Sequence, residues 1–142
     1  MIEQKINIWE PYTYGQWIVI TTNGFVKNNG ECVMGRGVAF QAKLRFPALP
    51  RRLGEHIKSF GNEVVVFDDL RLITFPVKHH WSEKADLELI KRSAEQLKLR
   101  LDFGQIPKVY CPRPGCGNGQ LNWEQVRPIM EQLDDRVIVV SL

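Results

Sequence analysis

Trp17-Ile-Val-Ile-Thr21 is the stretch that decides the fold of this chain, together with the loop Asn23–Gly37 that follows it. A continuous run of apolar and β-branched residues is typical of a strand buried on both faces of a sheet. The loop carries several glycines and runs into a helical pattern. The local order is therefore strand, glycine loop, helix.

Further strand-like runs occur along the rest of the chain. Glu63–Phe67 and Leu70–Phe75 are separated by Asp68-Asp69, which predicts a hairpin. The other predicted strands are Lys108–Cys111, Arg136–Val140 and, as a weaker first strand, Lys5–Trp9.

Helical periodicity lies between these runs. Apolar residues recur every three or four positions from about Glu83 to Asp102, which predicts a helix that Gly104 ends. Asn122 and Gln125 form a capping-box pattern before a helix that Pro128 is expected to loosen or kink. Shorter helices are predicted at Gly37–Phe46 and Arg51–Ser59. Alternating strands and helices indicate a layered α/β domain, and the hairpin makes its sheet mixed.

Composition excludes several classes of protein. The 142 residues suit one domain, and the 44% hydrophobic and 25% charged fractions exclude a disordered chain. No apolar run reaches the roughly 18 residues of a membrane span, so an integral membrane protein is excluded. The first residues lack a signal-peptide pattern, so we expect a cytoplasmic protein. A net charge of +3 tolerates an anionic ligand without indicating a nucleic-acid binder.

No metal or cofactor site is indicated. The three cysteines are odd in number and form no CxxC pair, which argues against a disulfide framework or structural zinc. His79 and His80 are adjacent, so they point to opposite faces of an extended segment and make a poor metal pair. Cys116 could be a nucleophile at a helix terminus, but a loop-packing role is favoured.

Two glycine loops carry the strongest functional signal. Asn23–Gly37 and Pro112–Gly119 each follow a strand and precede a helix, so backbone N–H groups and a helix N-terminus can face an anion. Both loops would lie at the carboxyl ends of strands, where α/β proteins bind ligands. Two such loops suit a diphosphate, although each could also be a simple turn. Neither matches a P-loop or a dinucleotide fingerprint. Lys78, at a strand end beside this site, could be a ligand or a nucleophile.

Four blocks of sequence are distinctive when taken together: Thr21–Gly24, Val33–Lys43, Phe75–Lys78 and Pro114–Trp123. They resemble the macrodomain family. In particular, they are similar to the branch that holds the terminal ADP-ribose glycohydrolase and the DNA ADP-ribosyl glycohydrolase antitoxin. The resemblance implies one macrodomain over residues 1–142, a three-layer α/β/α fold with a mixed central sheet, and a crevice for ADP-ribose.

The same resemblance implies a set of binding residues. One group comes from the first loop and one from the second loop. A pair near the first predicted strand would contact adenine, and Asn7 of this pair stands where the family commonly has an aspartate. The implied ligand-binding residues are Asn7, Ile8, Met34, Gly35, Arg36, Gly37, Val38, Pro114, Gly115, Cys116, Gly117, Asn118, Gly119 and Leu121.

For catalysis, the resemblance implies Lys78, assisted by Asn23 or Asn29. Such a lysine can attack the distal ribose of ADP-ribose, or orient the leaving group and water. Attack requires a lowered pKa, caused by partial burial or by a nearby charge from His79, His80 or Arg113. Gly119 stands where the protein-directed hydrolase has an aspartate, as in the DNA-directed antitoxin.

Three functions are therefore weighed. The leading hypothesis is hydrolysis of an ADP-ribosyl linkage through Lys78, with a nucleobase of DNA as one carrier of the modification. The second is a non-catalytic ADP-ribose reader, which would not need Lys78 at that position. The third is a weak hydrolase of free derivatives such as acetyl-ADP-ribose or ADP-ribose phosphate. A monomer without membrane association is expected.

Overall fold

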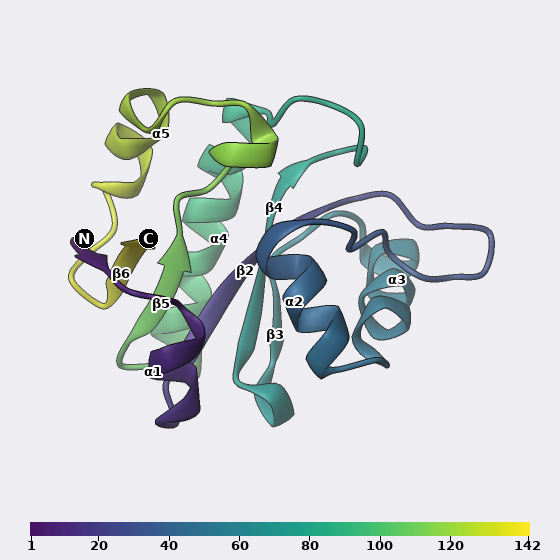
Figure 1. Cartoon of the computed structure of the whole chain (residues 1–142), viewed down its shortest axis with the longest axis horizontal. Helices are drawn as coiled ribbons and strands as arrows, with labels where there is room; N and C mark the ends of the chain where they lie inside the picture. Colours follow the sequence, from purple (N-terminus) through teal and green to yellow (C-terminus); the bar gives the residue numbers. More distant parts are fainter.

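The computed structural model describes all 142 residues and has a mixed sheet of six strands in the order β1-β6-β5-β2-β4-β3 (Figure 1). Every neighbouring pair is parallel except β3 and β4, which form the predicted antiparallel hairpin. The mixed sheet inferred from the sequence is therefore confirmed. The strands are β1 (Ile2–Lys5), β2 (Trp17–Asn23), β3 (Val65–Phe67), β4 (Leu72–Lys78), β5 (Val109–Pro112) and β6 (Val137–Ser141).

Helices cover both faces of the sheet, which confirms the three-layer α/β/α arrangement. One apolar cluster joins the sheet to α1, α2 and α3, and a second joins its other face to α4 and α5. Residues of β2 contribute to both clusters, because Val19 packs on one side and Ile18 on the other. The helices are α1 (Trp9–Thr13), α2 (Gly37–Arg45), α3 (Leu49–Phe60), α4 (Leu87–Gly104) and α5 (Trp123–Met130).

The capping signals are reproduced with small changes of boundary. The Asn122–Gln125 capping box is present at the start of α5, and the helix continues through Pro128. The helix expected from Glu83 begins later, because the Asp86 carboxylate accepts a hydrogen bond of 2.9 Å from the N–H of Glu88. Residues 79–86 consequently form a loop between β4 and α4.

The predicted strand Lys5–Trp9 is wrong beyond its first residue. β1 ends at Lys5, and the Asn7 side-chain oxygen accepts a 3.0 Å hydrogen bond from the N–H of Trp9. This local contact turns the chain into α1, where Pro11 sits in the first turn and needs no backbone N–H partner. The alternating apolar pattern was compatible with a strand, but the asparagine turn prevails.

The order of the strands brings the two glycine loops together. β2 lies between β4 and β5. After β2 the chain passes through α2 and α3 toward β3 and β4, whereas after β5 it passes through α5 toward β6. Neighbouring strands whose connections leave in opposite directions open a crevice at their carboxyl ends, which is the usual ligand site of such sheets.

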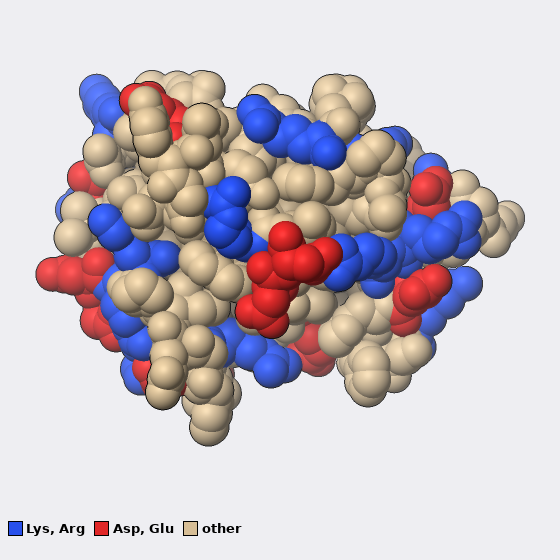
Figure 2. Space-filling model, turned by 90° about the horizontal axis from the view of Figure 1, so that it is seen from below, with Lys and Arg blue, Asp and Glu red and all other residues tan.

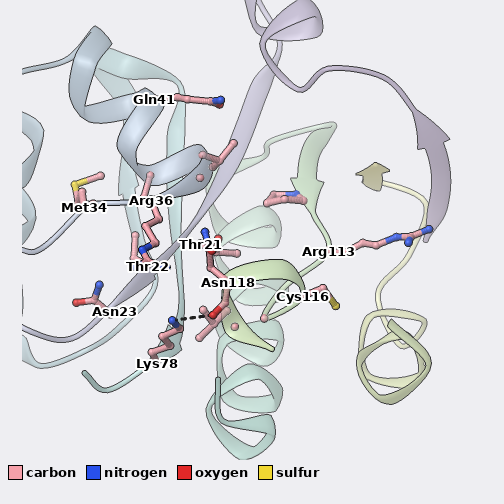
Figure 3. A pocket seen from close by; sticks show the side chains of 18 of the residues that line it. Thr21, Thr22, Asn23, Met34, Arg36, Gln41, Lys78, Arg113, Cys116 and Asn118 are labelled. Carbon is pink, nitrogen blue, oxygen red and sulfur yellow. Dashed lines mark hydrogen bonds between the residues drawn. The ribbon is translucent and has the colours of Figure 1, made fainter. Parts of the chain in front are cut away.

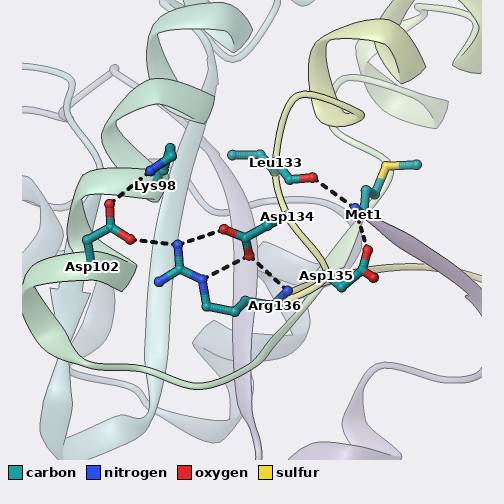
Figure 4. A network of polar contacts seen from close by, with 7 residues as sticks. All are labelled: Met1, Lys98, Asp102, Leu133, Asp134, Asp135 and Arg136. Carbon is teal, nitrogen blue, oxygen red and sulfur yellow. Dashed lines mark hydrogen bonds and ion pairs between the residues drawn. The ribbon is translucent and has the colours of Figure 1, made fainter.

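The opposite end of the sheet is fixed by charged contacts. The Arg136 guanidinium contacts Asp134 at 2.8 Å and Asp102 at 2.6 Å, and Lys98 contacts Asp102 at 3.0 Å (Figure 4). Hydrogen bonds from Arg136 lower the pKa of Asp134 to about 2. The network ties the end of α4 to the turn before β6.

Figure 2 shows the underside of the molecule, where basic and acidic side chains are interspersed. None of the five α-helices combines the length and the apolar character that a membrane-spanning helix requires.

Candidate functional site

A cavity of about 930 Å³ lies between the two glycine loops, at the carboxyl ends of the central strands (Figure 3). Its size is within the range of small-molecule and cofactor sites. Most of the residues implied by the sequence resemblance meet there. Those that line the cavity are Asn7, Ile8, Asn23, Met34, Gly35, Arg36, Gly37, Val38, Lys78, Gly115, Cys116, Asn118 and Gly119.

The two loops approach each other at the start of α2. A Cβ atom on Gly37 would lie 3.7 Å from the side-chain nitrogen of Asn118. Gly37 also has a φ of +59°, and no side chain caps the N-terminus of α2. Backbone N–H groups of the first helical turn are therefore free to bind an anion at this point.

The second loop packs so closely on α4 and on the loop before it that two of its positions leave no room for a side chain. A Cβ on Gly115 would lie 2.8 Å from Ile90 Cδ1, and φ there is +74°. A Cβ on Gly119 would lie 2.9 Å from the Cβ of Ala85. The glycines thus let the loop backbone lie against the protein while its other side borders the cavity.

Lys78 ends β4 and reaches across to the second loop. Its Nζ atom lies 3.2 Å from the carbonyl oxygen of Asn118 and 3.3 Å from that of Trp81 (Figure 3). Partial burial, followed by the positive charge of Arg36, lowers the pKa of Lys78. Both effects disfavour the ammonium form, so the site favours the neutral amine more than water does.

The source of the charge near Lys78 differs from the sequence-based expectation. His79 Nε2 pairs with the Asp86 carboxylate at 2.9 Å, and His80 Nδ1 accepts a hydrogen bond from the N–H of Ser82 at 3.1 Å. Neither histidine is a cause of the shift, and neither is Arg113. Arg36 comes from the first loop, and only the folded chain shows that this loop lies within electrostatic range of the end of β4.

Asn23 lies beside Lys78 in the sheet, but its side chain is largely engaged with the first loop. Its Nδ2 donates to the carbonyl oxygen of Val33 at 2.9 Å, and its Oδ1 accepts from the N–H of Phe25 at 2.9 Å. These contacts fix the loop at Phe25 and Val33, and the Cys32 thiol also contacts Asn23 Oδ1 at 3.9 Å. One amide hydrogen of Asn23 remains available for a ligand.

Four implied residues do not line the cavity. Asn29 is exposed at a turn, where its side chain hydrogen-bonds with Glu31, so the expectation that it joins Lys78 is wrong. The first loop is long enough to carry Asn29 away from the strand ends. Pro114 and Leu121 are buried behind the second loop, and Gly117 is exposed on its outer side.

Several lining residues were missed at the sequence level. Phe25, Lys27 and Trp81 have no motif that distinguishes them from ordinary loop residues. Thr21 and Thr22 lie near the end of β2 and within the block Thr21–Gly24, and these two signals could have identified them. The missed lining residues also include Gln41, Arg113, Ser141 and Leu142.

The thiol and metal alternatives receive no structural support. Burial raises the pKa of Cys116 despite an opposing effect of Arg113, which disfavours the thiolate needed for nucleophilic attack. No group of three or more His, Cys, Asp or Glu side chains could hold a metal ion. The chemistry available in the cavity is that of the amines of Lys78 and Lys27, the guanidinium groups of Arg36 and Arg113, and a set of backbone N–H groups.

Comparison with curated proteins finds clear relatives. The chain is 32% identical over 117 residues to the ADP-ribose glycohydrolase OARD1 of Bos taurus, covering 79% of this chain and 76% of that protein. It is also 32% identical over 126 residues to the DNA ADP-ribosyl glycohydrolase of Mycobacterium tuberculosis, covering 81% of this chain. It spans only 36% of the length of the latter protein. A scan against protein-family models finds no match.

Solved structures agree with these relatives. The macrodomain of Mycobacterium tuberculosis DarG superposes with a TM-score of 0.75 at 28% identity, over 89% of each chain. The macrodomain of Thermus aquaticus DarG has a TM-score of 0.78 at 24% identity, over 99% of this chain and 97% of that one, and supports the fold. Sequence identity and fold agree, and the chain belongs to the macrodomain family, in the branch that contains these glycohydrolases.

Proposed function

We propose that this protein binds ADP-ribose in the cavity and hydrolyses an ADP-ribosyl linkage, with Lys78 acting on the distal ribose. The observation that carries the proposal is the position of the Lys78 amine, 3.2 Å from the backbone of the second glycine loop and inside the cavity. A protein that only reads ADP-ribose has no need of an amine with a lowered pKa there. Relatives named ADP-ribose glycohydrolase support hydrolysis as the activity.

The diphosphate is assigned to the space between the two loops. The uncapped N-terminus of α2 offers backbone N–H groups, and Arg36 adds a full positive charge beside them. Together these groups can neutralise a pyrophosphate without a metal ion. Asn7 and Ile8 line the cavity at the β1 side of the sheet, and Lys78 lines it at the β4 side, so the ligand would extend across the strands.

Lys78 is assigned the role of nucleophile. The neutral amine attacks the anomeric carbon of the distal ribose, the bond from that carbon to the carrier breaks, and the departing atom takes the bonding electrons and the amine proton. Water then adds to the same carbon, releases ADP-ribose and returns a proton to the lysine nitrogen. Each step conserves atoms and charge, and the sum is hydrolysis.

We propose a DNA base as the carrier. The aspartate implied for the protein-directed hydrolase is replaced by Gly119, where even a Cβ would lie 2.9 Å from Ala85. No carboxylate from that position can therefore assist the reaction without a shift of the loop. Relatives named DNA ADP-ribosyl glycohydrolase, at 32% identity, support a DNA-linked substrate.

A substrate panel tests this proposal. The protein would be incubated with DNA carrying ADP-ribosylated thymidine, with ADP-ribosyl-glutamate, with ADP-ribose on a terminal phosphate and with acetylated ADP-ribose. We expect release of ADP-ribose from the DNA base to be the fastest, as followed by chromatography. Absence of turnover on all four substrates, with ADP-ribose still bound, would favour the reader instead.

The rate should depend on pH in a direction set by Lys78. Because attack needs the neutral amine, kcat/KM should rise about tenfold per pH unit and level off at the pKa of Lys78 in the free enzyme. Burial and Arg36 lower that pKa, so the plateau should lie below the ordinary lysine value of 10.5. Arg36→Gln should move the plateau to higher pH. A rate that falls with rising pH over this range would instead assign Lys78 as a proton donor.

A further inference from the structure

We propose that Phe25, His80 and Trp81, here called the aromatic cluster, form the subsite that binds the leaving base beside Lys78. The inference rests on the proposed function and adds the residues that would recognise the carrier. Phe25 lies in the first glycine loop, and His80 and Trp81 lie in the loop between β4 and α4. Phe25 and Trp81 line the cavity, and Trp81 is 50% exposed.

The cluster presents a connected aromatic surface. The Phe25 and His80 rings are 4.6 Å apart and meet edge to face, and the His80 and Trp81 rings are 5.3 Å apart and stacked. Trp81 lines the cavity, stacks on His80 and keeps half of its surface exposed, which leaves aromatic surface for a ligand. Nucleobases stack on such faces whatever their hydrogen-bonding pattern.

Its position matches the leaving-group side of the reaction. The backbone oxygen of Trp81 accepts a hydrogen bond from Lys78 Nζ at 3.3 Å, so the residue that carries the indole directly contacts the attacking group, and both residues line the cavity. Phe25 is tied to Asn23, which pairs with Lys78 in the sheet. The cluster therefore lies at the β4 end of the cavity, away from Asn7 at the β1 end.

The cluster is organised before any ligand arrives. Ser82 contacts His80 Nδ1 with its N–H at 3.1 Å and with its hydroxyl at 2.8 Å. These two contacts fix the imidazole between the other rings. A fixed aromatic surface binds a base with less loss of conformational entropy than mobile side chains would.

Basic side chains continue from the cluster along the first loop. Lys27 lines the cavity two residues after Phe25, with Glu31 at 3.8 Å as a loose partner. Arg51 and Lys58 of α3 reach within 3.5 and 3.9 Å of the Cβ position on Gly30. Aromatic side chains beside cationic ones are the combination that binds single-stranded nucleic acid, with bases on the rings and phosphates on the cations.

The test compares wild type, Trp81→Ala and Trp81→Phe on two substrates. One is a single-stranded oligonucleotide with one ADP-ribosylated thymidine, and the other is acetylated ADP-ribose, which has no aromatic leaving group. We expect Trp81→Ala to raise KM for the oligonucleotide about tenfold or more and to leave turnover of acetylated ADP-ribose unchanged. The backbone carbonyl that contacts Lys78 is kept. Trp81→Phe should restore most of the loss.

Phe103→Ala is the matched control, because Phe103 is 84% exposed and lies at the far end of α4. It should leave both substrates unaffected. A second readout uses Lys78→Ala to prevent turnover: the modified oligonucleotide should bind more tightly than ADP-ribose, and adding Trp81→Ala should remove that advantage.

Three outcomes would overturn the inference. In the first, Trp81→Ala slows both substrates equally, which would mean that the indole only positions Lys78. In the second, Trp81→Ala leaves KM for the oligonucleotide unchanged. In the third, wild type cleaves acetylated ADP-ribose but not the oligonucleotide. Failure of the proposed function is recognised separately, because wild type would then cleave neither substrate.

Discussion

Lys78→Ala is expected to lower turnover by a factor on the order of 10³ or more, as removal of a nucleophile does in other enzymes. ADP-ribose binding should be almost unchanged, because the Lys78 amine contacts only the carbonyl oxygens of Trp81 and Asn118. ADP-ribose stabilises the folded state by mass action, so it should raise the melting temperature of both proteins by a similar amount. Single-turnover kinetics and thermal unfolding with ADP-ribose measure the two effects.

Two further variants define the role of the amine. Lys78→Arg keeps a positive charge but cannot supply a neutral nucleophile, so we expect it to be as inactive as Lys78→Ala. Lys84→Ala removes an exposed lysine from the same loop and should retain full activity. Full activity of Lys78→Ala on every substrate would show that another group performs the reaction.

Gly54→Ala is expected to destabilise the protein by about 3 kcal/mol, the upper range for overpacking a tight contact. Alanine usually stabilises a helix interior relative to glycine by about 1 kcal/mol. Here, however, a Cβ would lie 2.0 Å from the carbonyl oxygen of Gly30 and 3.1 Å from the nitrogen of Cys32. Both neighbours are backbone, so the first loop or α3 must move. The melting temperature should fall by roughly 10 °C.

The same substitution should also weaken the site. The first loop is fixed to α3 by a 2.9 Å hydrogen bond from the N–H of Cys32 to the carbonyl oxygen of Pro50. Displacing that segment disturbs the loop that carries Arg36, so ADP-ribose affinity should fall together with stability. Glu55→Ala, at the exposed neighbouring position, is the control and should be near neutral. An unchanged or higher melting temperature for Gly54→Ala would mean that the first loop moves to accommodate the Cβ without loss of stability.

Local patterns predict most of the sheet and both loops of this fold. Short runs of consecutive apolar and β-branched residues identify β2, the β3–β4 hairpin, β5 and β6. The capping box of α5 is equally local. The predicted strand at Lys5–Trp9 is wrong beyond its first residue because alternating apolar residues occur both in strands and in short turns. The hydrogen bond of Asn7 selects the turn.

The residues that make up the site were harder to predict from the sequence than the fold was. Lys78 could be placed near the second loop because it ends a strand, but the influence of Arg36 on its pKa depends on the path of another loop. Asn29 was placed wrongly for the same reason, since counting residues along a long loop does not fix where it turns. Trp81 belongs to no motif, and only the folded chain shows that it lines the cavity and contacts Lys78.

The position of β6 between β1 and β5 has a consequence for the order of folding. Ile2 pairs with Ile138, so the first strand gains its partner only when the sixth is in place. Contacts between such distant parts of a chain form slowly, because a large loop must be closed before any contact is gained. Ile8 and Leu142 both line the cavity, so the nucleotide-binding site should mature last. During synthesis on the ribosome, the nascent chain should acquire a hydrophobic core before it acquires affinity for ADP-ribose.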